Sequence, residues 1–364
     1  MPIHVLEAMA REGFEAIHAL HDRRSGLVGF LGMHDTSRGP AFGGMRRLCY
    51  RDEREALMDC MRLSHAMARK CALSDLPAGG GKIVLLDRPR LDLRSAYEYV
   101  GRVLEDLGGR FYSGPDMGTG ERELGWVARR TRFVAGPGSA GPGELAESTA
   151  EGVFEGMAAA LAHLDGVVDW PARTVVVQGL GGVGERLAER LLGAGARVLG
   201  AEIDERRARR VARALGIELL SPADDVRRAC DVFAPCAGGG IVHDLSLERL
   251  HCRVVAGSAN NVLARDAHGE RLHERGILYV PDLVVNSGAL VRGVIFHLEG
   301  RREPVRAIGQ RIGRACAQLL RQAAAEGISP ARVAAREADA LVVRARETRD
   351  SELNSVRRDY IPAT

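Results

Sequence analysis

Apolar and polar residues follow two different patterns along the chain, and the change falls near its middle. In the first part, an apolar run at 26–35 predicts a strand. Apolar residues with helical spacing over about 52–70, with acids in the first turn, predict a helix. A strand at 82–86, a helix around 93–107 and a strand-like segment at 109–114 follow. This order predicts an alternating α/β domain whose strands end in loops available for a site.

The second part of the chain is more regular. Strand candidates, most of them separated by helical patterns, begin near residues 174, 197, 217, 231, 253 and 277. Six strands alternating with helices predict a doubly wound parallel sheet, which is the complete form of a dinucleotide-binding Rossmann domain. From residue 288 the pattern is helical up to the C-terminus.

The fold class that follows is α/β, with two domains and a cleft between them. A stretch rich in Gly and Pro at 137–145 predicts a hinge or linker. We expect a first α/β domain over 1–147 and the Rossmann domain over 148–332. The last helical stretch, about 333–364, is expected to pack back on the first domain.

A glycine-rich loop between a predicted strand and a predicted helix marks a dinucleotide site. Gly179, Gly181 and Gly184 have the spacing G-x-G-x-x-G, and Gly182 and Val183 complete the loop. The first glycine permits a tight turn and the second lets the backbone approach a pyrophosphate. The third allows close packing of helix on strand, and the helix N-terminus offers free N–H groups to an anion. The surrounding strand and helix make this motif far more specific than a lone triplet.

An acidic residue at the end of the next predicted strand bears on the choice of dinucleotide. Glu202 would accept hydrogen bonds from the adenosine ribose hydroxyls and repel a 2′-phosphate, which favours NAD over NADP. Arg206 and Arg207 follow closely and could neutralise such a phosphate, so NADP stays open.

The segment "LPAGGGK" places Lys82 directly after three glycines and before an apolar strand. It is not a phosphate-binding P-loop, because Leu76 and Ile83 stand where that motif needs Gly and Ser or Thr. One interpretation is a glycine turn followed by a surface lysine. The other is a catalytic amine, with glycines that let a substrate approach it.

Two further residues favour the catalytic interpretation. Lys70 ends the predicted helix and Asp116 follows a predicted strand, so both can reach the region of Lys82. Two ammonium groups in a poorly hydrated cleft oppose each other's charge, which lowers the pKa of one of them toward neutrality. A neutral lysine is a base, and the charged one can pair with a substrate carboxylate.

The composition excludes several classes of function. The 364 residues are 46% apolar and 27% charged, with a net charge of +3, as in an ordinary globular protein. Only 4% are aromatic, and no basic stretch is interleaved with aromatics, so a nucleic-acid partner is not expected. The arginine-rich run 204–216 is interpreted as a solvated helix face. No apolar run reaches the roughly 18 residues that a membrane span needs, so no membrane partner is expected.

Cysteine and histidine spacing predicts the compartment and argues against a metal. The seven cysteines form no C-x-x-C pair, and the eleven histidines form no H-E-x-x-H motif. We therefore expect reduced thiols, a cytoplasmic protein and no metal site. The N-terminal residues include acids and lack a long apolar core, so they do not form a signal peptide.

Eight ordered blocks carry a resemblance to a known family. The chain resembles the leucine, phenylalanine and valine dehydrogenase branch of the glutamate dehydrogenase superfamily, and is most similar in character to the phenylalanine type. The blocks are "GPAFGGMR" (39–46), "AMARK" (66–70), "LPAGGGK" (76–82), "GPDMGT" (114–119), "QGLGGVG" (178–184), "CDVFAPCA" (230–237), "VVAGSANN" (254–261) and "PDLVVNSG" (281–288).

The resemblance implies roles for individual residues. Lys70 would bind the substrate α-carboxylate, Lys82 would be the general base that activates water, and Asp116 would assist proton transfer at the amino group. Further residues implied at the substrate are Phe42, Gly43, Gly44, Met45, Gly114 and Asn286. Those implied at the cofactor, beyond the glycine loop and Glu202, are Thr149, Ala237, Asn260 and Asn261. Without the resemblance, the three asparagines could be loop caps and Asp116 a turn residue.

The implied reaction is reversible, NAD-dependent oxidative deamination of an apolar L-amino acid to its 2-oxo acid and ammonia. Gly114 would make room for an aromatic ring, which favours a phenylalanine-like substrate, although Phe42 could fill that room. Leucine, valine or tryptophan remain alternatives, as does a non-catalytic NAD-binding module. The resemblance also implies a homo-oligomer whose first domain binds the substrate and mediates assembly.

Overall fold

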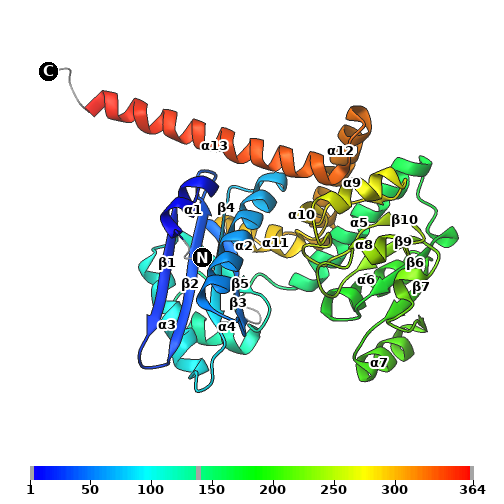
Figure 1. Ribbon diagram of the computed structural model, residues 1–364, viewed down its shortest axis with the longest axis horizontal. Coiled ribbons are helices and arrows are strands. Elements are labelled where there is room, and N and C mark those ends of the chain that lie inside the picture. Colours follow the sequence, from blue (N-terminus) through cyan, green and yellow to red (C-terminus); the bar gives the residue numbers. More distant parts are fainter. Residues whose placement is uncertain (1–3, 137–140, 361–364) are drawn as a thin grey trace. The chain divides into compact units, whose positions relative to one another are not determined.

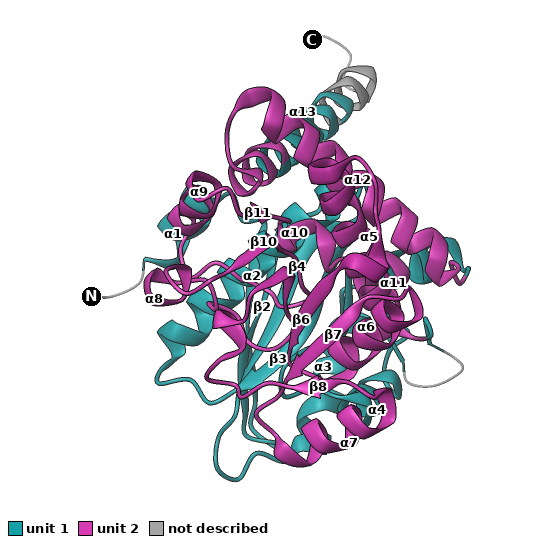
Figure 2. Ribbon diagram, turned by 90° about the vertical axis from the view of Figure 1, so that its right-hand side faces the viewer, with its two compact units in different colours: residues 1–143, 293–301, 338–364 teal, residues 144–292, 302–337 magenta. Residues whose placement is uncertain are grey.

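The computed structural model describes residues 4–136 and 141–360, with side chains up to residue 352. The chain forms two compact units (Figure 2). Unit 1 takes the chain up to Gly143, residues Gly293–Arg301 and the chain from Ala338, and unit 2 takes Glu144–Arg292 and Arg302–Glu337. Unit 1 thus includes residues Gly293–Arg301, which the sequence analysis assigned to the Rossmann domain. Residues 137–140 of the expected linker lie outside the described residues.

Unit 1 is built on a five-stranded mixed sheet with the order β1-β2-β4-β3-β5 (Figure 1). β1 and β2 are antiparallel, as are β2 and β4, whereas β3 lies parallel to both β4 and β5. The strands are β1 (Ala16–Asp22), β2 (Leu27–Asp35), β3 (Ala41–Leu48), β4 (Gly79–Leu86) and β5 (Phe111–Pro115).

Helices cover both faces of this sheet. α2 packs on β4 and β2, where its Ala56 and Cys60 meet Val84 and Leu86 of β4. α3 and α4 pack on the opposite face over a larger core that includes Met45. The helices of unit 1 are α1 (Val5–Glu12), α2 (Glu53–Leu73), α3 (Leu93–Asp106) and α4 (Glu121–Ala128).

Two C-terminal helices cross the division between the units. They are α11 (Gly288–Glu299) and α13 (Pro330–Tyr360). In its unit 1 part, α13 packs Val342 against Ala68 and Ala72 of α2. Arg69 of α2 forms a two-pronged ion pair with Asp339 at 2.7 Å, and Arg346 pairs with the buried Asp35.

Unit 2 contains a parallel six-stranded sheet with the order β11-β10-β9-β6-β7-β8. This is the doubly wound order of a Rossmann domain, in which the chain moves to one side of the first strand and then returns to the other. The strands are β6 (Thr174–Gln178), β7 (Arg197–Ala201), β8 (Glu218–Leu219), β9 (Cys230–Pro235), β10 (Cys252–Val255) and β11 (Leu278–Tyr279). The six strands predicted from the sequence are confirmed.

The helices of unit 2 precede, separate and follow these strands along the chain (Figure 1). α12 packs along α5, and α5 packs on α6. The helices are α5 (Leu145–Asp165), α6 (Gly182–Gly193), α7 (Glu205–Leu215), α8 (Asp244–Leu247), α9 (Ala267–Glu274), α10 (Asp282–Val285) and α12 (Val305–Glu326), with short 3-10 turns η2 (Trp170–Ala172) and η3 (Asp225–Arg227). Within the described part of the chain, no helix has the length and apolar character needed to cross a membrane.

The glycines before Lys82 have a different purpose from the one expected. Gly79, Gly80 and Gly81 belong to β4 and are buried, so they do not form a turn. A Cβ at Gly80 would collide with the backbone of Ala68 in α2, and one at Gly81 would collide with the ring of Phe111. These glycines let the helix and the neighbouring side chain approach the strand. They do not open a path for a ligand.

A pair of glycine substitutions tests this close packing. A Cβ at Gly43 in β3 would collide with the carbonyl oxygen of Gly81, whereas one at Gly114 would meet only the Ala135 Cβ, at 3.8 Å. We expect Gly43→Ala to lower the free energy of unfolding by about 1–3 kcal/mol or more. Gly114→Ala should change it by less than about 0.5 kcal/mol. Urea unfolding midpoints measure the difference, and equal midpoints would contradict the packing.

Candidate active site

One face of the unit 1 sheet carries the residues that the sequence pattern singled out. Side chains alternate along a strand, so Phe42, Gly44 and Arg46 of β3 share one side of the sheet. Tyr112 and Gly114 of β5 pair with Phe42 and Gly44 and lie on the same side. This is the face on which α2 packs, but α2 covers mainly β2 and β4.

Lys82 and Asp116 form a buried ion pair on this face. The Lys82 Nζ lies 2.5 Å from Asp116 Oδ2, and the two side chains are 7% and 15% exposed. Gly44 leaves room for the amine, because a Cβ there would stand 3.1 Å from Nζ. The Asp116 carbonyl also accepts a hydrogen bond from the Thr119 N–H at 2.9 Å. Asp116 is therefore a turn residue through its backbone and an ion-pair partner through its side chain.

Asp116 also belongs to a network of charged and polar side chains that includes Arg46, Asp59 and Tyr50. Arg46 Nε donates to the same Asp116 oxygen at 2.9 Å, and Arg46 Nη1 lies 3.1 Å from Asp59 Oδ2. The Tyr50 hydroxyl donates to that Asp59 oxygen at 2.8 Å. Because burial of paired charges adds little net stability, this network is better explained by a functional role than by folding.

The network changes the proton affinity of both members of the ion pair. Burial lowers the pKa of Lys82 below its usual value; Asp116 acts in the opposite direction, and Arg46 adds to the lowering. Burial would raise the pKa of Asp116, but the charges and hydrogen bonds of Lys82 and Arg46 outweigh it and lower that pKa to about 2. Asp116 is thus a carboxylate at any ordinary pH, and Lys82 is a lysine that releases its proton more easily than usual.

A cation that contributes to this lowering was not predicted from the sequence. Arg46 contacts Asp116 and lowers the pKa of Lys82. Lys70 lies in the last turn of α2 and is half-buried. Its expected contact with a substrate carboxylate stays a prediction.

Aromatic side chains line the same face beside the ion pair. The Phe42 and Tyr112 rings are stacked, with centroids 4.8 Å apart, and His297 from the unit 1 part of α11 lies 5.0 Å from Tyr112. No described atom of Phe42 is within 4 Å of a Cβ placed at Gly114, so Phe42 does not fill the room above that glycine. Met45 lies on the opposite face in the core and is fully buried, so it does not line this wall.

Sequence reasoning missed Arg46, Tyr112 and His297. Strand alternation could have found the first two, because Arg46 stands two residues after Gly44 and Tyr112 two residues before Gly114. His297 is brought in by a segment distant in sequence, and no local pattern predicts it.

In unit 2, the glycine loop between β6 and α6 has the geometry that a dinucleotide needs. Gly179 has φ +93°, a left-handed conformation that favours glycine. A Cβ at Gly184 would collide with the Gly179 carbonyl, whereas one at Gly181 would meet no described atom within 4 Å. The loop is therefore tightly packed at Gly184, where α6 meets the end of β6. Its backbone is uncovered at Gly181, which precedes the first residue of α6. These residues fit a pyrophosphate at a helix N-terminus.

Glu202 reaches back from the end of β7 toward this loop. Its carboxylate accepts hydrogen bonds from the backbone N–H groups of Leu180 and Asp204, both at 3.0 Å, and Arg207 lies 3.2 Å away. Burial would raise the pKa of Glu202, but these donors outweigh it and lower the pKa. Glu202 is therefore a fixed negative charge beside the loop, and Arg207 is already paired with it.

The other residues expected at the cofactor lie in two loops and one helix of unit 2. The Asn286 side-chain amide donates to Asn260 Oδ1 and to the Ser258 and Ala259 carbonyls, each at 3.1 Å. Asn261 has φ +52°. Asn286, which was expected at the substrate, thus holds the side chain of Asn260, which was expected at the cofactor, and the ligand contacts expected of the three asparagines stay predictions.

Two more residues of the expected cofactor site occupy defined positions. The Thr149 hydroxyl in α5 donates to the Leu145 carbonyl at 3.0 Å and accepts from the Ala289 N–H at 3.1 Å, which leaves one acceptor lone pair for a ligand. Ala237 is exposed and lies against Gly179.

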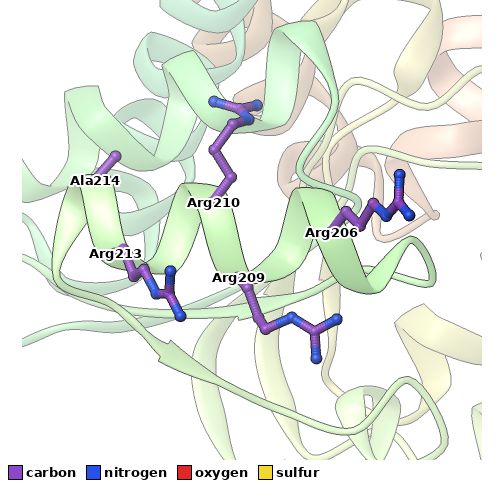
Figure 3. Close-up of a pocket in the computed structure, with 5 residues that line it drawn as sticks. All are labelled: Arg206, Arg209, Arg210, Arg213 and Ala214. Atoms are coloured by element: carbon purple, nitrogen blue, oxygen red, sulfur yellow. The ribbon is translucent and has the colours of Figure 1, made fainter.

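A surface hollow along α7 is basic but carries none of the expected site residues. It is lined by Arg206, Arg209, Arg210, Arg213 and Ala214 (Figure 3). All five residues are exposed, and Arg209 and Arg210 pair with Glu205 and Glu185. This agrees with the prediction that 204–216 is a solvated helix face.

A Rossmann unit with a pyrophosphate loop, in the same chain as a unit that carries a buried lysine and aspartate, defines an NAD(P)-dependent dehydrogenase. Comparison with known proteins gives the family. Residues 16–133 match the Glu/Leu/Phe/Val dehydrogenase dimerisation domain, and residues 201–296 match the glutamate/leucine/phenylalanine/valine dehydrogenase domain.

Individual relatives agree with this match. The chain is 40% identical to the phenylalanine dehydrogenase of Thermoactinomyces intermedius over 82% of this chain and 83% of the relative. It is 38% identical to the leucine dehydrogenase of the same organism over 79% of each. The crystal structure of L-tryptophan dehydrogenase from Nostoc punctiforme superposes with a TM-score of 0.80 at 29% identity, covering 94% of this chain and 99% of that one. The chain belongs to the glutamate/leucine/phenylalanine/valine dehydrogenase family and is an amino-acid dehydrogenase, an oxidoreductase that acts on CH–NH₂ donors.

Proposed function

We propose that the protein catalyses reversible oxidative deamination of an apolar L-amino acid to its 2-oxo acid and ammonia, with NAD as the acceptor. The observation that carries this proposal is the buried Lys82–Asp116 pair at 2.5 Å, in which burial lowers the pKa of the lysine and so favours its unprotonated form, the form that can act as a base. Bound NAD would accept the hydride from the substrate α-carbon.

The proton steps are assigned to the ion pair. With its proton released, Lys82 Nζ takes a proton from the water that attacks the imino carbon, and the water oxygen becomes the oxygen of the oxo acid. Asp116 is a carboxylate that accepts a proton from the amino group and returns it to the departing ammonia. Lys70 keeps its charge and binds the substrate carboxylate.

The aromatic wall favours a phenylalanine-like substrate. Phe42 and Tyr112 form a stacked aromatic pair on this face, and a Cβ placed at Gly114 would meet only the Ala135 Cβ, so the glycine leaves room that a bulkier residue would fill. The named relatives act on phenylalanine and leucine, which supports an apolar substrate. Leucine, valine and tryptophan are the alternatives, because an apolar pocket separates neighbouring aliphatic side chains by only about 1–3 kcal/mol.

A panel of L-amino acids assayed for NAD reduction at alkaline pH tests this function. We expect turnover with apolar amino acids and the highest kcat/KM with L-phenylalanine or a related aromatic. Lack of turnover with every apolar L-amino acid, in protein that still binds NAD, would favour the non-catalytic NAD-binding module instead.

The preference for NAD over NADP is proposed to depend on Glu202. Its carboxylate would bind the ribose hydroxyls and repel a 2′-phosphate. We expect Glu202→Ala to lower the ratio of kcat/KM for NAD to that for NADP by about 10- to 100-fold, the effect of losing hydrogen bonds to a charged group. The control is Glu205→Ala, which removes an exposed acid that pairs only with Arg209 among the described ion pairs. An unchanged ratio in Glu202→Ala would contradict the assignment.

We also propose that the protein is a cytoplasmic homo-oligomer. The match of residues 16–133 to a dimerisation domain supports assembly through unit 1, and the seven free cysteines fit a reducing compartment. The cleft expected between the two domains remains a prediction.

A further inference from the structure

His297 occupies a distinctive position in unit 1, at the far end of the aromatic wall. Its ring lies 5.0 Å from the Tyr112 ring and 6.3 Å from the Phe42 ring. These two residues precede Gly114 and Gly44 by two positions on their strands. Gly44 is the glycine beside the Lys82 amine, so His297 stands on the same face of the sheet as the reacting groups.

The His297 ring presents a polar atom with no partner in its surroundings. Its Nε2 is buried and makes no hydrogen bond within the residues that the structure describes. Burial lowers the pKa of His297 to about 4, so the ring is neutral at ordinary pH and offers one donor and one acceptor nitrogen. Buried polar atoms normally have partners, and an exception suggests that a water or ligand group completes the bond.

The spacing along the strands matches the length of an aromatic amino acid. Two residues on a strand span about 6.6 Å, which is roughly the distance from the α-carbon of a tyrosine to its phenol oxygen. A substrate whose α-carbon lies beside Lys82, above Gly44 and Gly114, would therefore extend its ring over Phe42 and Tyr112. The far edge of that ring would reach His297.

We propose that His297 is a specificity-determining residue that hydrogen-bonds an N–H or O–H group on the ring of an aromatic L-amino acid. The inference rests on the proposed function and singles out, among its aromatic substrates, those whose side chains carry such a group, namely an indole or a phenol. A phenol can pair with either tautomer of the ring, whereas an indole requires Nε2 as the acceptor. In this arrangement Phe42 and Tyr112 pack against the ring of the substrate, and His297 forms the hydrogen bond with the N–H or O–H group on that ring.

The test compares kcat/KM for L-tyrosine, L-tryptophan and L-phenylalanine in the wild type, in His297→Leu and in His297→Gln. We expect His297→Leu to lower kcat/KM for at least one of the two ring-donor substrates about tenfold relative to L-phenylalanine. His297→Gln should restore part of the loss, because its amide oxygen can accept the same hydrogen bond. Loss with tyrosine alone identifies a phenol site, and loss with tryptophan alone identifies an indole site.

The outcomes separate this inference from the proposed function. If the wild type oxidises phenylalanine or leucine but neither ring-donor substrate, the role of His297 is wrong while the reaction stands. The role of His297 is also wrong if His297→Leu is folded, as checked by thermal unfolding, and leaves kcat/KM for both tyrosine and tryptophan unchanged relative to phenylalanine. Lack of turnover with every apolar amino acid in the wild type would overturn the proposed function and this inference with it.

Discussion

Lys82→Ala is expected to lower kcat by about 10²- to 10⁴-fold, the usual contribution of a positioned acid or base. The variant loses the amine that takes a proton from water, while Asp116 keeps its second partner Arg46 at 2.9 Å. The dinucleotide loop belongs to unit 2, so binding of NADH, followed by its fluorescence, should remain. Activity within tenfold of the wild type would contradict the role of Lys82 as the base.

The scarcity of lysine in the chain suggests a sharper control for the role of Lys82 as a base. Lys70 and Lys82 are its only two lysines among 51 basic residues, and the other 49 are arginines. Arginine keeps its proton at any ordinary pH, so it can replace lysine where only charge matters and cannot replace it as a base. We expect Lys82→Arg to lose as much kcat as Lys82→Ala. Lys70→Arg, which keeps the charge, should mainly raise KM and leave kcat within about tenfold.

Unit 2 was predictable from the sequence because its signals are local. Each strand is a short apolar run next to a helical pattern, and the glycine loop stands where a strand passes into a helix. The parallel pairing follows from the alternation, since parallel strands need crossover connections, and the glycine loop after the first strand indicates the Rossmann arrangement. Glu202 was likewise found because the motif itself sets the approximate distance to its acidic residue.

Unit 1 was less predictable because its sheet is assembled from residues distant in sequence. β3 contains Gly43, Gly44, Arg46 and Arg47, which obscure its strand pattern, and the sequence analysis did not identify it. The parallel pairing of β3 with β5 brings Arg46 to Asp116, and the pairing of β3 with β4 brings both of them to Lys82. Only the pairing register reveals Arg46 as a neighbour of this ion pair.

The two lysines were a signal that sequence reasoning could have used further. In a chain that uses arginine almost everywhere else, each lysine marks a position where compact shape or loss of a proton is needed. Arg46 carries no such signal, because it is one of 49 arginines in the chain.

Asp116→Asn and Arg46→Met are expected to move the pH profile in opposite directions. Asp116 raises the pKa of Lys82 and Arg46 lowers it. Removing the carboxylate therefore lowers that pKa, and removing the guanidinium raises it. Because the base works only without its proton, kcat/KM rises as pH passes the pKa of Lys82. The rising limb should shift to lower pH in Asp116→Asn and to higher pH in Arg46→Met.

The maximal kcat of each variant distinguishes a residue that exchanges a proton with the substrate from one that only changes the pKa of Lys82. Asp116→Asn also removes the group that exchanges a proton with the substrate amino group, so its maximal kcat should fall about 10²-fold or more. Arg46→Met leaves both Lys82 and Asp116 in place, and Asp59 keeps Tyr50 at 2.8 Å and Arg62 at 2.7 Å as partners. Its maximal kcat should therefore fall much less. A shift of both rising limbs in the same direction would show that Lys82 does not titrate within this network, and some other group would then have to be the base.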